Sequence, residues 1–337
     1  MELPLSTEHE GSHASESSDA LLLAACWSAL RLLRERIRDE ARPFDFLSLR
    51  IGAEPQLAID ARLDLAPGTF DVVLLTTHAT IAPRRSDTVL LVDEWLTIDV
   101  VQRGRVPQEL VDLLRLYIPY CLAPVEARRR ERAVAVCHFA QTLDGRIATD
   151  SGDSRWIGCP ENLIHAHRMR ALCDAVLVGS GTLRRDRPRL NVRHVEGNDP
   201  IRIVLGSSTL DLECLTLSSS SPVLTVGHRG DCSVLVEPRE GRIRGGDLMR
   251  ALFARGIHSV LVEGGASTTS ALLADGAVDI LQLHIEPLLL GPGLSPFQRP
   301  PAAKIAEAIT FRSQTFFSVG SGMMFVGRPA RGDHADG

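Results

Sequence analysis

The sequence predicts an α/β protein with a mainly parallel sheet flanked by helices, preceded by a smaller N-terminal α/β domain. From about residue 133, short apolar runs alternate with segments of helical periodicity, a pattern typical of parallel β-α units. A chain of 337 residues is also long enough for two domains. A highly charged segment at 126–132, EARRRER, separates two apolar regions and marks the expected boundary between them.

The N-terminal part begins with residues 1–19, which are acidic and serine-rich and are expected to form a disordered tail. Apolar residues at helical spacing then predict an amphipathic helix from Ala20, with Asp19 as its N-cap. A second helix is expected from Pro107. Between them, short apolar runs separated by turn residues predict strands at 56–61, 71–76 and 88–92. Residues 20–125 are therefore expected to form a small α/β domain, whose role the sequence does not indicate.

The C-terminal part, residues 133–329, has the stronger alternation of strands and helices, and residues 330–337 are expected to be a second disordered tail. The predicted strands are 133–139, 175–178, 201–205, 223–226, 234–236, 259–262 and 280–285, with a terminal strand pair within 316–326. The predicted helices are 161–172, 246–255 and 266–275.

Composition excludes some functions. A hydrophobic content of 44%, a charged content of 23% and a net charge of -5 are those of a globular protein without the basic surface that nucleic acids or anionic membranes favour. No apolar run reaches the roughly 18 residues needed to cross a bilayer, and the acidic start is not a secretory signal. The seven cysteines include no C-x-x-C pair, which indicates isolated thiols in a reducing compartment, so a cytoplasmic location is expected.

Ligands of open α/β sheets bind beyond the carboxyl ends of the strands, so the loops there are the candidate sites. After the strand ending at Val262 comes Glu263-Gly264-Gly265 and then a helix, which is either a phosphate-binding turn or a tight turn capped by Ser267 or Thr268. The loop 179–182 matches only part of the G-x-G-x-x-G pattern, and a simple turn is the better interpretation. The arginine-rich stretch 184–193 either binds a phosphorylated ligand or is a solvated loop.

Other chemistries lack their motifs. His194-Val195-Glu196 matches half of a zinc deaminase signature, but no P-C-x-x-C follows it. His165 and His167 stand two residues apart on a predicted helix, so they face different sides and cannot share a metal. The serine-hydrolase pattern G-x-S-x-G does not occur. The sequence therefore predicts neither a metal site nor a serine nucleophile.

Taken together, these segments resemble the pyrimidine reductase of riboflavin biosynthesis, the half that in many bacteria is fused to a pyrimidine deaminase. The resemblance covers residues 133–329 and rests on six segments in the order of that family. These are TLDGRIA at 142–148, SGDSRWIG at 151–158, MRALCDAVLVGSGTLRRDRPRLNVR at 169–193, PIRIVLGSS at 200–208, LVEGGASTTSALLADGAVD at 261–279 and IEPLLLGPG at 285–293.

The resemblance implies a dihydrofolate-reductase-like fold, NADPH as the cofactor, a homodimer, and reduction of the ribosyl group of a ribosylamino-pyrimidine 5′-phosphate. It places the cofactor contacts on Ala140, Trp156, Thr182, Asp186, Ser207, Gly264, Gly265, Ala266, Ser267 and Thr268, and along the helix to Ala271. It places the substrate contacts on Ser154, Arg170, Leu190, Arg193 and Glu263. Glu263 and Asp186 are the candidates for assisting proton delivery. Ser207 and Ser208, which follow a strand and a glycine, leave no carboxylate to repel the 2′-phosphate of NADPH.

The chain also departs from that family. His138 stands in the first strand of the domain where many members have a lysine, so a role of that lysine cannot be transferred to this chain. Arg187 replaces one of two acidic residues that often precede the loop proline, and the residues before 133 do not resemble the deaminase. Two other interpretations therefore stay open. One is a reductase of the same fold that acts on another heterocycle, and the other is a catalytically silent NADPH-binding or regulatory protein.

Overall fold

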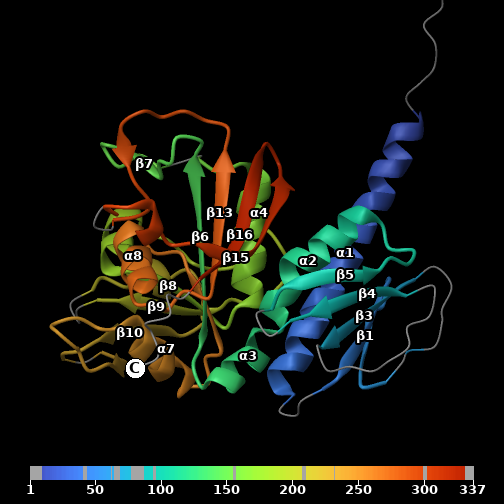
Figure 1. The fold of residues 1–337 in the computed structure, drawn as a ribbon, viewed down its shortest axis with the longest axis horizontal. Coiled ribbons are helices and arrows are strands. Elements are labelled where there is room, and N and C mark those ends of the chain that lie inside the picture. The colour runs from blue at the N-terminus through green and yellow to red at the C-terminus, as the bar shows by residue number, and fades with distance from the viewer. Residues whose placement is uncertain are drawn as a thin grey trace, which may run out of the picture. The chain divides into compact units, whose positions relative to one another are not determined.

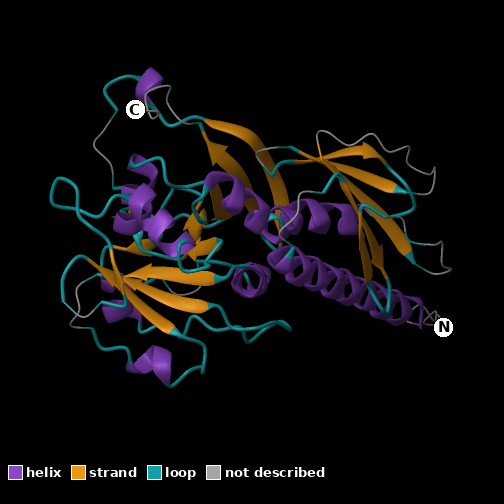
Figure 2. Cartoon of the chain, turned by 90° about the horizontal axis from the view of Figure 1, so that it is seen from below, coloured by secondary structure: helices purple, strands orange, loops and turns teal. Residues whose placement is uncertain are grey.

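The computed structural model describes residues 10–40, 44–61, 63, 69–76, 87–93, 96–154, 157–206, 210–230, 232–298 and 302–330. The chain divides into two compact units, unit 1 at Met1–Leu122 and unit 2 at Ala123–Gly337. Figure 1 labels most of the helices and strands of both units, and Figure 2 distinguishes helices from strands by colour. None of the helices in the described part of the chain combines the length and the apolar character that a membrane span requires.

Unit 1 is a five-stranded mixed sheet with two main helices. Its elements are α1 (Glu10–Asp39), β1 (Phe46–Ile51), β2 (Gln56–Ile59), β3 (Phe70–Thr76), β4 (Thr88–Val92), β5 (Ile98–Gln102) and α2 (Gln108–Cys121). The strand order is β2-β1-β3-β4-β5, in which only β3 and β4 run parallel. Helix α1 packs against α2 and β1, and in Figure 2 the two helices lie side by side against the strands.

The core of unit 1 follows the predicted helical spacing. Cys26, Leu30, Leu33 and Ile37 recur every three or four residues along α1 and have no exposed surface. The helix itself begins at Glu10, ten residues earlier than the sequence predicts, because the segment 10–19 contains no proline and joins a strongly helical run. Residues 1–9 lie outside the described residues. The strands β1 and β5 were not predicted from the sequence: β1 alternates apolar and polar residues from Leu47 to Ile51 but was overlooked, and β5 shows no clear alternation.

Unit 2 is built on a nine-stranded sheet. Its strands are β6 (Val134–Thr142), β8 (Ala175–Gly179), β9 (Ile201–Leu205), β10 (Val223–Gly227), β11 (Val234–Leu235), β12 (Ser259–Val262), β13 (Ile280–Glu286), β15 (Phe311–Val319) and β16 (Gly322–Pro329). They follow the order β11-β10-β9-β8-β12-β6-β13-β16-β15. The first seven of these are parallel, and the hairpin β15–β16 adds the antiparallel edge, which confirms the predicted mainly parallel sheet. Figure 1 shows β6, β13, β16 and β15 following one another across it.

Helices and one short pair of strands complete unit 2. The helices are α3 (Ala123–Arg130), α4 (Pro160–Leu172), α5 (Ser180–Asp186), α6 (Glu213–Thr216), α7 (Gly245–Phe253), α8 (Ala266–Ala274) and the 3₁₀ turn Ile305–Glu307. A small two-stranded sheet pairs β7 (Ala148–Thr149) with β14 (Gly293–Leu294). The central strands bury apolar residues on both faces, as parallel sheets require, with Ala135, Leu177 and Val260 on one face and Val136, Val176 and Leu261 on the other.

The charged segment 126–132, predicted as a linker, is instead part of unit 2. Its first residues belong to helix α3, in which Glu126 forms ion pairs with Arg129 and Arg130. Arg130 and Arg132 both contact the carboxylate of Asp279, which also accepts the backbone N–H of Ala135. This charge network ties the beginning of β6 to the turn before β13, so these arginines stabilise the sheet rather than extend into solvent.

Candidate active site

A cavity of about 470 Å³ lies beyond the carboxyl ends of β6 and β12. Its walls come from the end of β6, the segment 147–163 and the beginning of α4, from α5, and from the turn between β12 and α8. This is the edge where parallel sheets bind ligands, because the loops there are free to carry function while the strands hold them in place.

Seven residues of the predicted site line this cavity together. They are Ala140, Ser154, Thr182, Asp186, Glu263, Gly264 and Gly265. They come from four separate segments of the chain, and the parallel order of β8, β12 and β6 brings these segments together. Two further predicted residues, Trp156 and Ser207, lie outside the described residues.

The turn from β12 into α8 presents unpaired backbone amides. Gly265 is the N-cap of α8, and its N–H donates to Thr182 Oγ1 at 3.0 Å. The next two amides, of Ala266 and Ser267, have no acceptor among the described residues, whereas those of Thr268 and Thr269 return to Gly265 O. A Cβ at Gly264 would lie 2.9 Å from Thr268 Cβ, so a side chain there would fill the turn. Free amides at a helix N-terminus and a turn without side chains fit the phosphates of a dinucleotide.

Glu263 and Arg170 form a two-pronged ion pair next to this turn. Arg170 Nε lies 2.8 Å from Glu263 Oε1, and Arg170 Nη2 lies 2.6 Å from Glu263 Oε2. The third guanidinium nitrogen, Nη1, donates to Asn191 O at 3.1 Å. Burial would raise the pKa of Glu263, but the charge and hydrogen bonds of Arg170 outweigh it and hold that pKa below its usual value. Glu263 is therefore a carboxylate at neutral pH and can accept hydrogen bonds but not donate them.

Arginines gather on one side of that pair. Partial burial lowers the pKa of Arg193, and the charges of the nearby Arg170 and Arg189 lower it further. Its side chain contacts Asn191 Oδ1, and its backbone N–H donates to His167 Nδ1. The buried Leu190 adopts a left-handed backbone conformation, with φ of 53°, and so turns the chain between these arginines. Clustered guanidinium groups of this kind fit a phosphate.

Asp186, at the end of α5, differs electrostatically from Glu263. Partial burial raises its pKa, and the neighbouring Arg185 only partly opposes this. Of the two carboxyl groups that the sequence singles out, Asp186 is thus the one that is more easily protonated.

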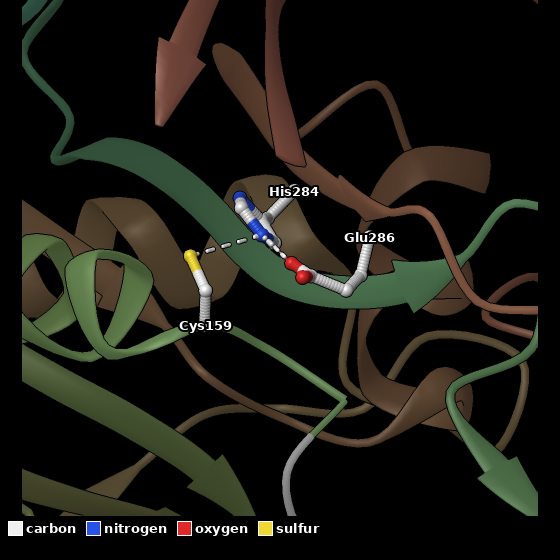
Figure 3. A group of neighbouring side chains, drawn as sticks. All are labelled: Cys159, His284 and Glu286. Carbon is white, nitrogen blue, oxygen red and sulfur yellow. Dashed lines mark hydrogen bonds and ion pairs between the residues drawn. The ribbon is translucent and has the colours of Figure 1, made fainter. Parts of the chain in front are cut away.

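Three groups near the cavity lie outside the site predicted from the sequence, although His138 is noted there as a departure from the family. Asn162, in the first turn of α4, lines the cavity, and its Oδ1 lies 3.2 Å from His138 Nε2 on β6. The third, Cys159, lines the cavity as well and belongs to a buried cluster with His284 and Glu286 (Figure 3). No spacing in the sequence could have indicated these contacts, since Cys159 and His284 are far apart in the chain and meet only because β6 pairs with β13 beneath α4.

The cluster of Cys159, His284 and Glu286 has the donor types of a metal site, but its hydrogen bonds are those of a structural anchor. His284 Nε2 lies 2.7 Å from Glu286 Oε2, and that carboxylate also accepts Ser321 Oγ and the backbone N–H of Cys159. The Cys159 thiol donates to Val319 O at 3.4 Å. His284 Nδ1 is buried without a partner among the described residues, whereas a metal-ligating histidine usually donates its second nitrogen. The cluster therefore fixes the beginning of α4, and with it the cavity wall.

His165 and His167 point to different neighbours, as the sequence predicts. His165 Nε2 contacts Gln282 Oε1 on β13, while His167 Nδ1 accepts the N–H of Arg193. The turn at Asp144-Gly145 is structural, since the Asp144 carboxylate accepts hydrogen bonds from Thr142 Oγ1 and from the N–H groups of Leu290 and Gly291, which lower its pKa to about 2.

A mainly parallel sheet with a glycine turn into α8 and a cavity at its carboxyl edge makes unit 2 an α/β domain with its candidate site beyond the strand ends. Residues 133–325 match the family model described as RibD C-terminal domain, and the chain belongs to that family. Among curated relatives, the riboflavin biosynthesis protein RibD of Mycobacterium tuberculosis is 29% identical over 190 residues, which are 55% of this chain and 51% of the relative. The 2,5-diamino-6-ribosylamino-4(3H)-pyrimidinone 5′-phosphate reductase of Methanothermobacter thermautotrophicus is 32% identical over 174 residues, 48% of this chain and 80% of the relative.

Solved structures extend the likeness in fold to unit 1. RibD of Acinetobacter baumannii superposes with a TM-score of 0.59 at 18% identity, over 91% of this chain and 98% of the other. A diaminohydroxyphosphoribosylaminopyrimidine deaminase/5-amino-6-(5-phosphoribosylamino)uracil reductase of Thermotoga maritima gives 0.53 at 20% identity, over 90% and 99%. Since unit 2 is less than two thirds of the chain, these matches extend well into unit 1. By sequence, however, the chain spans about half the length of the RibD relative from Mycobacterium tuberculosis.

Unit 1 does not contain the zinc ligands of a deaminase. Zinc deaminases bind their metal through the histidine of H-x-E and the two cysteines of P-C-x-x-C. Residues 1–122 contain neither pattern, and their two cysteines are Cys26 and Cys121. Both cysteines are completely buried, and the Cys121 thiol donates to Leu30 O at 3.4 Å. The residues present thus do not fit a catalytic zinc ion.

Proposed function

We propose that the chain is an NADPH-dependent reductase that converts a ribosylamino-pyrimidine 5′-phosphate into the ribitylamino product in riboflavin biosynthesis. The observation that carries this proposal is the junction at the end of β12, where the free amides of α8 adjoin the Glu263–Arg170 pair and the cavity. The membership in the family and the name of the Methanothermobacter relative support it.

In this proposal each group of residues has a separate task. The amides of Ala266 and Ser267 bind the phosphates of the dinucleotide, and the arginines around Asn191 bind the 5′-phosphate of the substrate. NADPH, when bound, supplies the hydride for C1′ of the sugar. Glu263, fixed by Arg170 at the cavity wall, accepts hydrogen bonds from the substrate and orients it. Asp186, whose pKa is raised by partial burial, is the carboxyl group that relays a proton to the reduced sugar.

We further propose that this chain reduces but does not deaminate. Its N-terminal unit lacks the zinc ligands in sequence, although solved structures of the fused proteins cover that unit in fold. Deamination of the pyrimidine, which removes its exocyclic amine, must then be catalysed by another protein.

Two features support the remaining parts of the proposal, a cytoplasmic homodimer. All seven cysteines are free thiols, which suits a reducing compartment. At the edge of the nine-stranded sheet, β15 exposes Phe316 and the adjacent β16 exposes Met323, and an edge strand with apolar side chains favours pairing with a second copy.

The direct test is a steady-state assay of the purified chain with NADPH and each of two substrates, the deaminated and the undeaminated ribosylamino-pyrimidine 5′-phosphate. We expect saturable NADPH oxidation with one of them and much slower oxidation with NADH. NADPH binding without oxidation with either pyrimidine would contradict the proposal and favour a silent cofactor-binding protein.

A further inference from the structure

A buried imidazole and a buried amide form one wall of the cavity. Asn162 is 7% exposed and lines the cavity from the first turn of α4. His138 is 6% exposed and lies behind it on β6, with its Nε2 atom 3.2 Å from Asn162 Oδ1. The proposed function does not use either residue.

His138 is electrically neutral under ordinary conditions. Burial lowers its pKa to about 4; the nearby Glu263 and the bond to Asn162 oppose this shift, while His284 and Arg170 add to it. His165 is also close, with its ring centroid 5.0 Å from that of His138. The uncharged ring therefore bonds to Asn162 Oδ1 by donating its Nε2 hydrogen, because a carbonyl oxygen can only accept.

This bond determines which end of the Asn162 amide faces the cavity. Because Asn162 Oδ1 accepts from His138, Asn162 Nδ2 lies on the side of Gly158. A Cβ atom added at Gly158 would come within 2.6 Å of this Nδ2 atom. Gly158, which also lines the cavity, leaves that space open. Among the described residues, none accepts a hydrogen bond from Nδ2, so its two hydrogens are available to a ligand.

We propose that Asn162 is a substrate-recognition residue whose Nδ2 donates to an acceptor atom of the heterocycle, and that His138 is the positioning residue that fixes this orientation. The inference rests on the proposed function and identifies the part of the substrate that binds here. The donor is neutral, whereas the arginines near Asn191 carry the positive charge. The uncharged carbonyl edge of the base therefore fits Asn162, and the 5′-phosphate fits the arginines. A site built to donate to an acceptor also rejects analogues that lack that acceptor.

The test compares Asn162→Ala and Asn162→Asp with wild type in the reductase assay. Each variant should lose about 10- to 100-fold in kcat/KM for the pyrimidine, the effect of one hydrogen bond in a closed site. The dissociation constant for NADPH, measured by fluorescence titration, should change less than about twofold, since the variant leaves the dinucleotide site intact. Asn198→Ala, an exposed asparagine outside the cavity, is the matched control and should behave as wild type.

A double-mutant cycle tests the role of His138. His138→Ala should reduce kcat/KM, and in the Asn162→Ala background the same change should have almost no further effect, because His138 acts through Asn162. His138→Gln retains a donor and should recover part of the loss. Losses in kcat/KM that add up in the double variant would overturn the inference. So would an Asn162→Ala variant that unfolds at the wild-type temperature and has unchanged kcat/KM.

The failure of this inference differs from the failure of the proposed function. If wild type oxidises no NADPH with either pyrimidine, the reductase proposal fails. Calorimetric titration of the two pyrimidine phosphates into the NADPH-saturated protein then decides the inference. Binding to wild type that is at least 10-fold weaker in Asn162→Ala supports it, and equal affinity for the two proteins, or no binding to either, overturns it.

Discussion

Replacing Glu263 with glutamine tests the ion pair at the cavity wall. Glutamine has nearly the same shape, but it loses the negative charge and one of the two acceptors that bind Arg170 at 2.8 and 2.6 Å. The two side chains are only 12% and 14% exposed, so solvent screens the pair weakly. Removing one partner of a buried pair costs about 3–5 kcal/mol, and the acceptor that glutamine retains should limit the loss to about 1–3 kcal/mol.

The same substitution should lower turnover by about 10- to 100-fold, the worth of one charged hydrogen bond that orients the substrate. NADPH affinity should fall by less than about threefold, because the amides of α8 are untouched. The measurements are urea unfolding, steady-state kinetics and fluorescence titration with NADPH. Arg239→Gln, which breaks an exposed pair with Asp247, is the control and should alter none of them. Equal losses in turnover and NADPH affinity would refute this assignment of Glu263.

Three further outcomes are expected. Ala266→Pro removes a free amide at the first position of α8, where proline is well tolerated, so NADPH should bind about 10-fold more weakly without loss of thermal stability; unchanged affinity would show that this amide binds no phosphate. The free energy of unfolding should decrease as pH falls from 6.5 to 4, because the folded-state pKa of His138, about 4, is below its unfolded value and the unfolded chain takes up the proton first. This decrease should be up to about 3 kcal/mol smaller in His138→Gln, and parallel curves for the two proteins would contradict the neutral state of His138. The full chain purified with zinc in the medium should hold no stoichiometric zinc and release no ammonia from the undeaminated pyrimidine; either finding would restore a deaminase function to unit 1.

Much of unit 2 could be predicted because its signals are local. The strand Ser259–Val262 followed by Glu263-Gly264-Gly265 shows both a buried parallel strand and a helix start, and the structure places both there. The cavity residues predicted from the family segments, such as Thr182 and Asp186, also meet at one edge of the sheet. The sheet order that brings them together is a property of the whole domain.

Other features could not be predicted because they depend on contacts between distant segments. The charged run 126–132 looks solvated in sequence, and only the position of Asp279 beside Arg130 and Arg132 shows that it belongs to the sheet. In the same way, the proposed positioning role of His138 depends on its contact with Asn162, which lies on α4 and is distant in the sequence. In unit 1 the two helices and the strands β2, β3 and β4 were predicted, whereas β1 and β5 were missed; β5 carries no clear alternation.

The most direct test of the account is the fate of the hydride. The purified chain should be incubated with the pyrimidine phosphate and NADPH that carries two deuterium atoms at C4 of the nicotinamide, and the product analysed by NMR. We expect one deuterium at C1′ of the ribityl chain, because the arginines and the α8 turn bring sugar and cofactor together. Deuterium on a ring carbon of the heterocycle, or a product without deuterium, would contradict it.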